Sequence, residues 1–365
     1  MTLLKTLRNE WGLLVSVATV AVFWRWGNVL FAELPNPLWF AFIFLWLFIV
    51  ILGSALAVVR HADVLAERLG EPYGTLILTL SVTAIEVMSI SAVMLHGANN
   101  PTLVRDTLFA VVMIILNGMV GLSLLIGGLR HREQHYNLQG ANAFLGVIIP
   151  LAVFSLILPN FTLTTPGPRL SRHQEIFLMI MSAGLYCAFL TIQTGRHRGF
   201  FTLGDEPAER AAKAREPIAP HALLLFAYMI PVVSLAEKLA HPIDYLVETL
   251  HFPDAWGGLI IALLVATPEA IGAAKAALRN HLQRSMNIFL GSVLATIGLT
   301  VPAMIIMSHI TGRSIDLGLE HTDFVLLLLT LAVSVVTFAS GRTNILQGIV
   351  HLLLFASYVL LLVEG

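Results

Sequence analysis

The sequence predicts an all-α polytopic membrane protein, and three observations lead to that fold class. Hydrophobic residues make up 57% of the 365 positions and charged residues only 12%, whereas a soluble domain carries about 25% charged residues. Apolar runs of about 18 residues or more recur along the whole chain, each long enough to cross a hydrocarbon core of roughly 30 Å as a helix. Charge clusters and Pro or Gly breaks such as Pro35-Asn36-Pro37 and Pro166-Gly167-Pro168 separate these runs.

We expect about eleven transmembrane helices. The first apolar run follows Lys5 and Arg8 as a signal peptide would, but no small-residue cleavage pattern follows it, and Arg25 lies between two tryptophans like an interfacial anchor. We therefore interpret it as a retained first helix. The expected spans are 11–31, 37–59, 73–95, 105–128, 140–159, 174–194, 220–240, 255–278, 285–309, 322–339 and 343–363.

Charge and composition limit the partners. The net charge of −1 and the pI of about 6.9 give no field that would favour nucleic acid. Cys187 is the single cysteine, so the chain cannot form an internal disulfide. The lipid bilayer is the expected surrounding, no cofactor is expected, and composition leaves the oligomeric state open.

Lys and Arg residues gather on one side of the expected spans. With the N-terminus in the cytoplasm, most of them fall in cytoplasmic loops, among them Arg130, Arg132 and those of the polar segment 195–219. This positive-inside pattern predicts a cytoplasmic N-terminus and a C-terminus on the opposite side.

An internal repeat relates the two halves of the chain. Residues 74–86 align without a gap onto 257–269, which places Glu86 over Glu269, and after a short gap Asn117 falls opposite Thr296. Each half then has five spans, and an odd number of crossings gives the halves opposite orientations. The predicted organisation is an N-terminal transmembrane helix (1–36), a first five-helix repeat (37–194), a cytoplasmic linker (195–219) and a second, inverted five-helix repeat (220–365). Inverted-repeat transporters bind substrate near the membrane midplane.

The two glutamates are the main candidates for function. A carboxylate at the bilayer centre costs at least about 2.5–3.5 kcal/mol, so it is rarely present without a role. Burial favours its protonated form and a bound cation favours its ionised form, so one group can exchange a proton for a metal ion. Two carboxylates suit a divalent ion such as Ca²⁺. The alternative is that each glutamate is a protonated helix–helix hydrogen-bonding group, or that Glu269 pairs with Lys275.

Polar residues near the two glutamates complete the candidate cation- and proton-binding site. Pro268 frees a backbone carbonyl one turn earlier, and such carbonyls at membrane depth can line a cavity. Small-residue packing and backbone-bonded hydroxyls remain the alternatives for the hydroxyl residues. The candidates are Thr83, Asn117, Ser292 and Thr296, in addition to Glu86 and Glu269.

The segments Arg60–Gly74 and Gly291–Pro302 resemble the calcium/proton exchanger branch of the cation/calcium exchanger superfamily, and within it the bacterial ChaA-type antiporters. The resemblance implies one helix plus two inverted five-helix repeats, a location in a bacterial inner membrane, and Glu86 and Glu269 as paired acids that bind cation and proton. The chain departs from the usual Gly-Asn-x-x-Glu pattern at Val82–Glu86 and Val265–Glu269.

The predicted function is secondary antiport that exports Ca²⁺, Na⁺ or K⁺ in exchange for protons. The departures from the family pattern keep a monovalent-only Na⁺(K⁺)/H⁺ antiporter open. Rival functions of other classes are an acid-lined cation channel and an intramembrane hydrolase. The hydrolase would need a nucleophile or a metal-binding set, and none converges on the glutamates in the sequence, so an enzyme is not expected. His351, inside the last span, is either a proton shuttle or a packing histidine.

Overall fold

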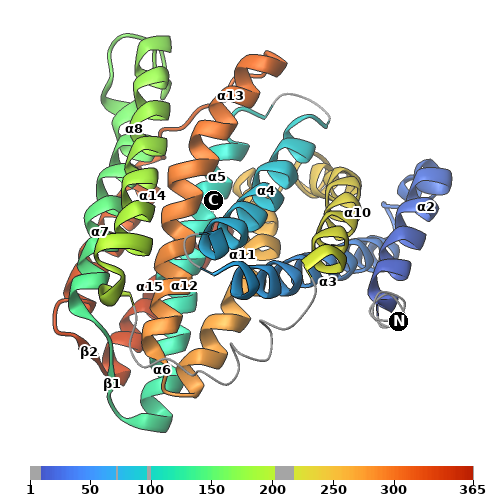
Figure 1. Cartoon of the computed structure of the whole chain (residues 1–365). Helices are drawn as coiled ribbons and strands as arrows, with labels where there is room; N and C mark the ends of the chain where they lie inside the picture. The colour runs from blue at the N-terminus through green and yellow to red at the C-terminus, as the bar shows by residue number, and fades with distance from the viewer. Residues whose placement is uncertain (1–9, 71–72, 97–99, 202–217, 365) are drawn as a thin grey trace. The chain divides into compact units, whose positions relative to one another are not determined.

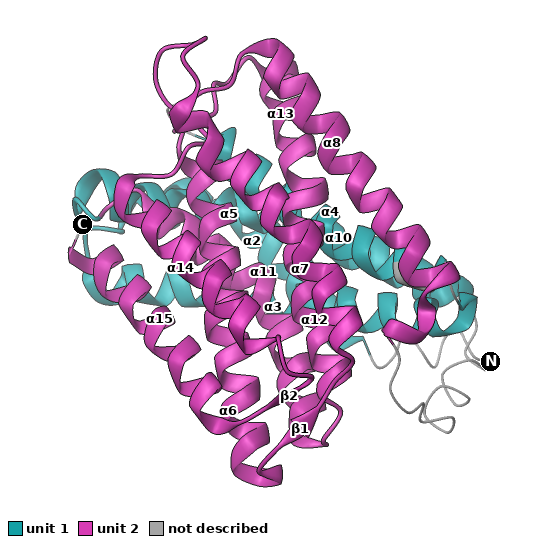
Figure 2. Ribbon diagram, turned by 90° about the vertical axis from the view of Figure 1, so that its left-hand side faces the viewer, with its two compact units in different colours: residues 1–99, 206–252 teal, residues 100–205, 253–365 magenta. Residues whose placement is uncertain are grey.

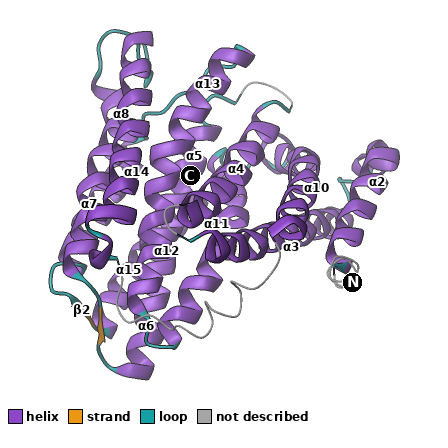
Figure 3. Cartoon of the chain, in the orientation of Figure 1, coloured by secondary structure: helices purple, strands orange, loops and turns teal. Residues whose placement is uncertain are grey.

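The computed structural model describes residues 10–70, 73–96, 100–201 and 218–364, and Figure 1 and Figure 3 show that these residues are almost entirely helical. The α-helices are α2 (Trp11–Ala32), α3 (Pro37–Leu69), α4 (Tyr73–Met94), α5 (Leu103–Met113), α6 (Val120–His131), α7 (Leu138–Ala152), α8 (Arg172–Thr191), α10 (Ile218–Asp244), α11 (Ala255–Leu278), α12 (Leu282–Ala295), α13 (Val301–Thr311), α14 (His321–Thr337) and α15 (Ile345–Glu364).

Short π-helical and 3₁₀ segments interrupt or extend several of these helices. The strands β1 (Gln134–His135) and β2 (Arg342–Thr343) form one antiparallel pair, with Gln134 opposite Thr343. The π segments are η1 (Ile114–Met119), η2 (Val153–Ile157), η4 (Ile192–Arg196), η6 (Tyr245–Thr249) and η7 (Thr296–Thr300), and the 3₁₀ segments are η3 (Leu158–Phe161) and η5 (Arg198–Phe200).

The predicted fold class is confirmed. Among the described residues, 10 helical stretches are long and apolar enough to span a membrane, and His321–Thr337 is a shorter apolar helix. Together they match the eleven expected spans in order. Most of the 195–219 linker, residues 202–217, lies outside the described residues.

Several helices run past the expected span ends. The second span was expected to end at residue 59, but α3 continues to Leu69 and ends at Gly70, whose φ of 67° is a left-handed value that favours glycine. An apolar run marks the thickness of the bilayer, whereas the helix ends where its backbone hydrogen bonding stops. At about 1.5 Å per residue, the 33-residue α3 is longer than the hydrocarbon core.

The chain divides into two compact units, coloured separately in Figure 2. Unit 1 comprises residues 1–99 and 206–252, and unit 2 comprises residues 100–205 and 253–365. Each unit therefore contains helices from both halves of the sequence. The predicted boundaries at 36, 194 and 219 follow the sequence repeat rather than these compact units, and they stay a prediction.

Unit 1 is built from α2, α3, α4 and α10, with α10 packed along both α3 and α4. A polar cluster, mostly buried, joins α2, α3 and α10. Glu10 accepts hydrogen bonds from Arg60 (2.6 Å) and from the Tyr228 hydroxyl (2.8 Å). Beside it the Nδ1 atoms of His61 and His221 lie 2.9 Å apart. A charged side chain with two hydrogen-bonding partners can remain buried at moderate cost.

Unit 2 has three central spans. Of their most apolar stretches, 78% is buried in Leu103–His131, 72% in Leu282–Thr311 and 61% in Ala255–Leu278, against 22% in Arg172–Arg196 and in Ile345–Glu364. Residues buried by protein on most sides need not be apolar to satisfy lipid. The central spans are therefore where polar site residues can be held.

Contacts at both ends show that α11 runs parallel to the α5–η1–α6 span. Near its start, a Cβ on Gly258 would lie 2.6 Å from the backbone of Asp106 and Thr107. Near its end, Nε2 of His131, the last residue of α6, lies 2.9 Å from the Leu278 carbonyl, and Gln134, in β1 just after α6, donates a hydrogen bond to the Ala277 carbonyl at 2.9 Å. The N-terminal ends of the two spans thus lie together, and so do their C-terminal ends.

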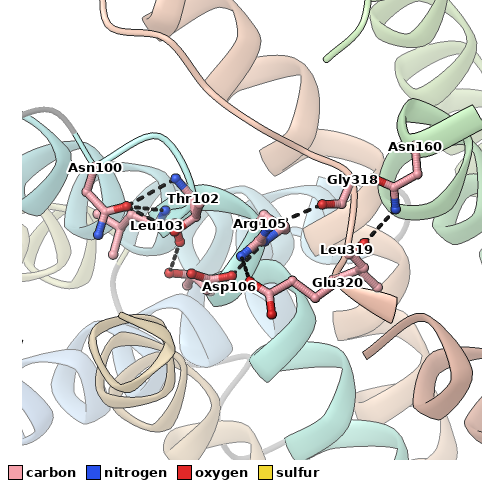
Figure 4. A network of polar contacts seen from close by, with 10 residues as sticks. Asn100, Thr102, Leu103, Arg105, Asp106, Asn160, Gly318, Leu319 and Glu320 are labelled. Carbon is pink, nitrogen blue, oxygen red and sulfur yellow. Dashed lines mark hydrogen bonds and ion pairs between the residues drawn. The ribbon is translucent and has the colours of Figure 1, made fainter. Parts of the chain in front are cut away.

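The beginning of α5 is fixed by the network in Figure 4. Arg105 Nε donates to Asp106 Oδ1 at 2.7 Å, and the guanidinium also donates to the Gly318 carbonyl and to Glu320, both at 3.3 Å. Asn160 donates to the neighbouring Leu319 carbonyl. These bonds tie α5 to the segment that leads into α14.

Replacing Gly258 by alanine is expected to destabilise unit 2, because the added methyl group would meet backbone atoms that cannot rotate away. Overpacking of this kind costs about 1–3 kcal/mol. Thermal melting of the detergent-purified protein should show a Tm several degrees lower for Gly258→Ala. Gly272→Ala, on the same helix, is the control, because its Cβ would meet only a side-chain carbon of Ile288 at 3.6 Å. Equal melting of the two variants would contradict the close contact.

Candidate ion-binding site

Unit 1 contributes Glu86, near the middle of α4. The side chain is 2% exposed, and Thr83, one turn earlier on the same helix face, is also buried. Ser89, one turn later, is buried as well, and its hydroxyl has no hydrogen-bonding partner among the described residues. A buried carboxyl with hydroxyls one turn away on either side is a group of oxygens that suits a cation or a proton.

Unit 2 contributes Glu269, on α11. The helix continues through Pro268 without a break from Ala255 to Leu278. The carboxylate of Glu269 accepts a hydrogen bond from the hydroxyl of Ser292, on the adjacent α12. Lys275, considered as an ion-pair partner, lies in the last turn of α11, six residues further along the chain.

The Glu269–Ser292 bond joins two of the residues that the sequence predicts for the site. Ser292 is a candidate because it is a small hydroxyl residue on the span after Glu269. A hydroxyl that donates to a carboxylate stabilises its ionised form and leaves the hydroxyl oxygen able to contact a cation. This pair is the part of the predicted site that unit 2 brings into direct contact.

The other two predicted residues of unit 2 lie in π-helical segments. Asn117 is in η1 and Thr296 begins η7, and both side chains are buried. The repeat alignment places these two residues opposite each other, and the two π segments overlap in it, although η1 begins three residues earlier than η7 relative to the alignment. A π segment shifts backbone hydrogen bonds from the regular helical pattern and is frequent at functional sites.

Helix packing places Asn117 at about the depth of Glu269. Because α5 and α11 are parallel, Asp106 and Gly258 mark a common level. Asn117 and Glu269 each follow eleven residues later, or roughly 16 Å at 1.5 Å per residue. The segments α11, α12 and η1 also pack on one another.

Asn117 is held at both ends of its amide. Its Nδ2 donates to Thr330 Oγ1 at 2.8 Å, and its Oδ1 lies 3.2 Å from Nδ1 of His351. The other ring nitrogen of His351 lies 2.9 Å from the Thr337 hydroxyl. Neither Thr330 nor Thr337 was among the predicted site residues, because a lone threonine in an apolar helix is usually bonded to its own backbone.

The predicted site residues thus fall into two sets. Glu269, Ser292, Thr296 and Asn117 belong to packed segments of unit 2, whereas Glu86 and Thr83 belong to unit 1. A common site for the two glutamates stays a prediction. Within the described ranges, no cluster of three or more His, Cys, Asp or Glu side chains suited to a metal ion is present. A cation in unit 2 would therefore rely on hydroxyl, amide and backbone oxygens besides one carboxylate.

Outside the membrane-spanning segments, burial raises the pKa of the Tyr136 hydroxyl, so it stays protonated and remains a donor. It lies 3.4 Å from the Thr337 carbonyl. The C-terminal end of α14, which holds Thr337, is thereby attached to the β1 region.

Known proteins resemble the chain over nearly its whole length. It is 40% identical over 363 residues to the sodium-potassium/proton antiporter ChaA of Escherichia coli (strain K12), covering 98% of this chain and 97% of that protein. It is 24% identical over 272 residues to the Ca(2+)/H(+) antiporter ChaA of Bacillus subtilis (strain 168), covering 70% and 75%. The solved structure of native YfkE has the same fold, with a TM-score of 0.72 at 19% identity over 97% of this chain and 100% of that one.

The family of sodium/calcium exchanger proteins matches residues 39–195 and 220–363. These two matched segments cover the two expected five-helix repeats and leave out the first helix and the linker. The chain belongs to the sodium/calcium exchanger protein family.

Proposed function

We propose that the chain is a secondary antiporter that exports Ca²⁺, Na⁺ or K⁺ across a bacterial inner membrane in exchange for protons. The observation that carries the proposal is the half-buried Glu269 on a central span, bonded to Ser292, with the buried Glu86 at the equivalent sequence position. The E. coli and B. subtilis relatives, a sodium-potassium/proton antiporter and a Ca(2+)/H(+) antiporter, support the same exchange.

The glutamates supply the coupling in this proposal. Each carboxylate binds either a proton or a cation, because a cation favours the ionised form and burial favours the protonated one. Binding of one ligand therefore releases the other. An inward proton gradient then drives the cation outward. The positive-inside pattern predicts that the N-terminus lies in the cytoplasm in this orientation.

A monovalent-only exchanger is the second candidate, and the kind of oxygen ligand that unit 2 offers near Glu269 favours it. Calcium sites in proteins gather several oxygens and gain affinity from the number of charged ligands. Among the described residues near Glu269, the oxygen donors named above are uncharged, namely Ser292, Thr296 and Asn117. The relative with 40% identity is named for sodium and potassium.

Removing the charge of either glutamate is expected to abolish exchange. Everted membrane vesicles that express the protein are energised to form a ΔpH, and CaCl₂, NaCl or KCl is added while a pH-sensitive dye is followed. Wild type should dissipate ΔpH on cation addition, whereas Glu86→Gln and Glu269→Gln should retain less than about one hundredth of that rate, because a neutral amide cannot exchange a proton for a cation.

The control for that experiment is Glu237→Gln, which removes a half-exposed carboxylate bonded to Lys238 and should leave the rate unchanged. Full dissipation by either test variant would refute the role of that glutamate. Cation flux that dissipates no ΔpH would identify a channel. Failure of the wild-type protein to respond to all three cations would refute antiport.

Competition at shared carboxylates predicts that cation affinity depends on pH. As pH rises, fewer protons compete for the glutamates, so the apparent KM for the cation should fall by up to tenfold per pH unit over their titration range. Initial rates measured in the same vesicles between pH 6 and roughly 9.5 would check this. A KM that stays constant over that interval would indicate separate proton and cation sites.

Ser292→Ala is expected to weaken cation binding without preventing folding. It removes the hydroxyl that bonds to Glu269, worth about 1–2 kcal/mol for a charge-assisted hydrogen bond, so the apparent KM should rise about five- to thirtyfold. The control is Ser155→Ala, which removes a buried hydroxyl that bonds to the backbone of its own helix. If both variants shift KM equally, the Ser292 hydroxyl has no particular role at the site.

A further inference from the structure

His351 lies on α15, in the last span, and its side chain is completely buried. Its two ring nitrogens have different side-chain partners, Asn117 Oδ1 at 3.2 Å from Nδ1 and Thr337 Oγ1 at 2.9 Å from Nε2. The ring also makes a hydrogen bond with the backbone of Leu116, in η1. In the part of the chain that the structure describes, these partners are all uncharged. A buried imidazole without a carboxylate partner is stable in its neutral form.

The bonding pattern fixes which nitrogen carries the hydrogen. Asn117 donates through Nδ2 to Thr330, so its Oδ1 faces His351, and an amide oxygen can only accept. Nδ1 of His351 is therefore the donor. In a neutral imidazole the other nitrogen is an acceptor, so Nε2 accepts from the Thr337 hydroxyl.

The far end of this chain of bonds is itself anchored. The Thr337 carbonyl, in the last turn of α14, accepts from the Gln347 side chain at 3.2 Å and from the Tyr136 hydroxyl at 3.4 Å. The Tyr136 hydroxyl in turn accepts from the Gly341 backbone N–H at 3.1 Å. The imidazole is thus held between the π segment η1 and a fixed helix end, which leaves it little freedom to rotate.

We propose that His351 is a positioning residue for transport: its Nδ1–H holds the amide of Asn117 in one orientation and thereby sets the cation affinity of the site in unit 2. This inference rests on the proposed function, in which Asn117 is a cation ligand. Without His351, the Asn117 amide can turn about its last side-chain bond and move its oxygen away from the level of Glu269. A ligand that must be ordered on binding gives a weaker site.

The test compares two replacements that keep different halves of the imidazole. The side-chain nitrogen of asparagine lies close to the position of Nδ1, whereas glutamine reaches toward the position of Nε2. In everted vesicles, His351→Asn should keep the apparent cation KM within about twofold of wild type. His351→Gln should raise it roughly three- to tenfold, the effect of losing one interhelical hydrogen bond within a membrane, with a maximal rate per transporter changed less than about twofold.

A purely structural role for His351 would change the amount of folded protein or the maximal rate and would not separate the two variants. Equal KM values for His351→Asn and His351→Gln, at matched abundance in the membrane, would therefore overturn the proposal. If His351→Gln does not accumulate, Thr337→Val provides the second comparison, because it removes the donor to Nε2. It should raise KM in the same direction, and Thr337→Ser should not. A wild-type KM for Thr337→Val would then overturn the proposal.

Glu269→Gln, measured in the same vesicles, separates this inference from the proposed function. If that variant still exchanges cations for protons, the proposed role of Glu269 in binding the cation and the proton is wrong. If it is inactive and the His351 variants are indistinguishable, only the positioning role fails.

Discussion

The close parallel packing of α11 against the α5–η1–α6 span is the constraint on which the rest of unit 2 depends. At one end the backbone of Asp106 approaches Gly258 so closely that no side chain fits between them, and at the other Gln134 bonds to the Ala277 carbonyl. These two contacts, one near the start of α5 and one just after α6, fix the relative direction of the two spans and their displacement along the helix axis. With that register set, Glu269 and Asn117 come to about the same depth, and α12 can pack against both segments and place Ser292 on the carboxylate.

Much of this fold could be predicted from the sequence, because a bilayer admits few spanning structures. Helices satisfy their own backbone hydrogen bonds in lipid, so an apolar run of sufficient length is almost always a spanning helix. The ends could not be predicted as well. The extension of α3 from residue 59 to Leu69 carries polar residues that lie beyond the apolar run, and hydropathy does not register them as helix. The π segments η1 and η7 were not predicted either, since one extra residue in a turn leaves no clear signal in an apolar sequence.

The residues of the candidate site likewise divide into those that the sequence could identify and those that it could not. Glu86 and Glu269 could be identified because a carboxylate in an apolar span is costly and because the repeat aligns them. Ser292 followed from its place on the next span. The partners of Asn117 could not be identified, because Thr330 and His351 are 213 and 234 residues away from it in the sequence. Their contact depends on which helices are neighbours, and a hydroxyl or an imidazole within an apolar run has several ordinary explanations.

The repeat also shows where the two halves have diverged chemically. Where the second half has Ser292 and Thr296, the first has Met113 and Asn117. The sulfur of Met113 lies 3.5 Å from both Asn117 Nδ2 and Thr330 Oγ1, so a soft thioether occupies a place where a hydroxyl would be a better ligand for a hard cation. Asn117 in turn has two hydrogen-bonding partners, Thr330 and His351, that orient its amide. One half therefore contributes a hydroxyl bonded directly to the acid, and the other a single oriented amide. In the site that we propose for unit 2, so few charged oxygens make the cation affinity depend on the placement of the neutral ones, and therefore on the more distant residues that hold them.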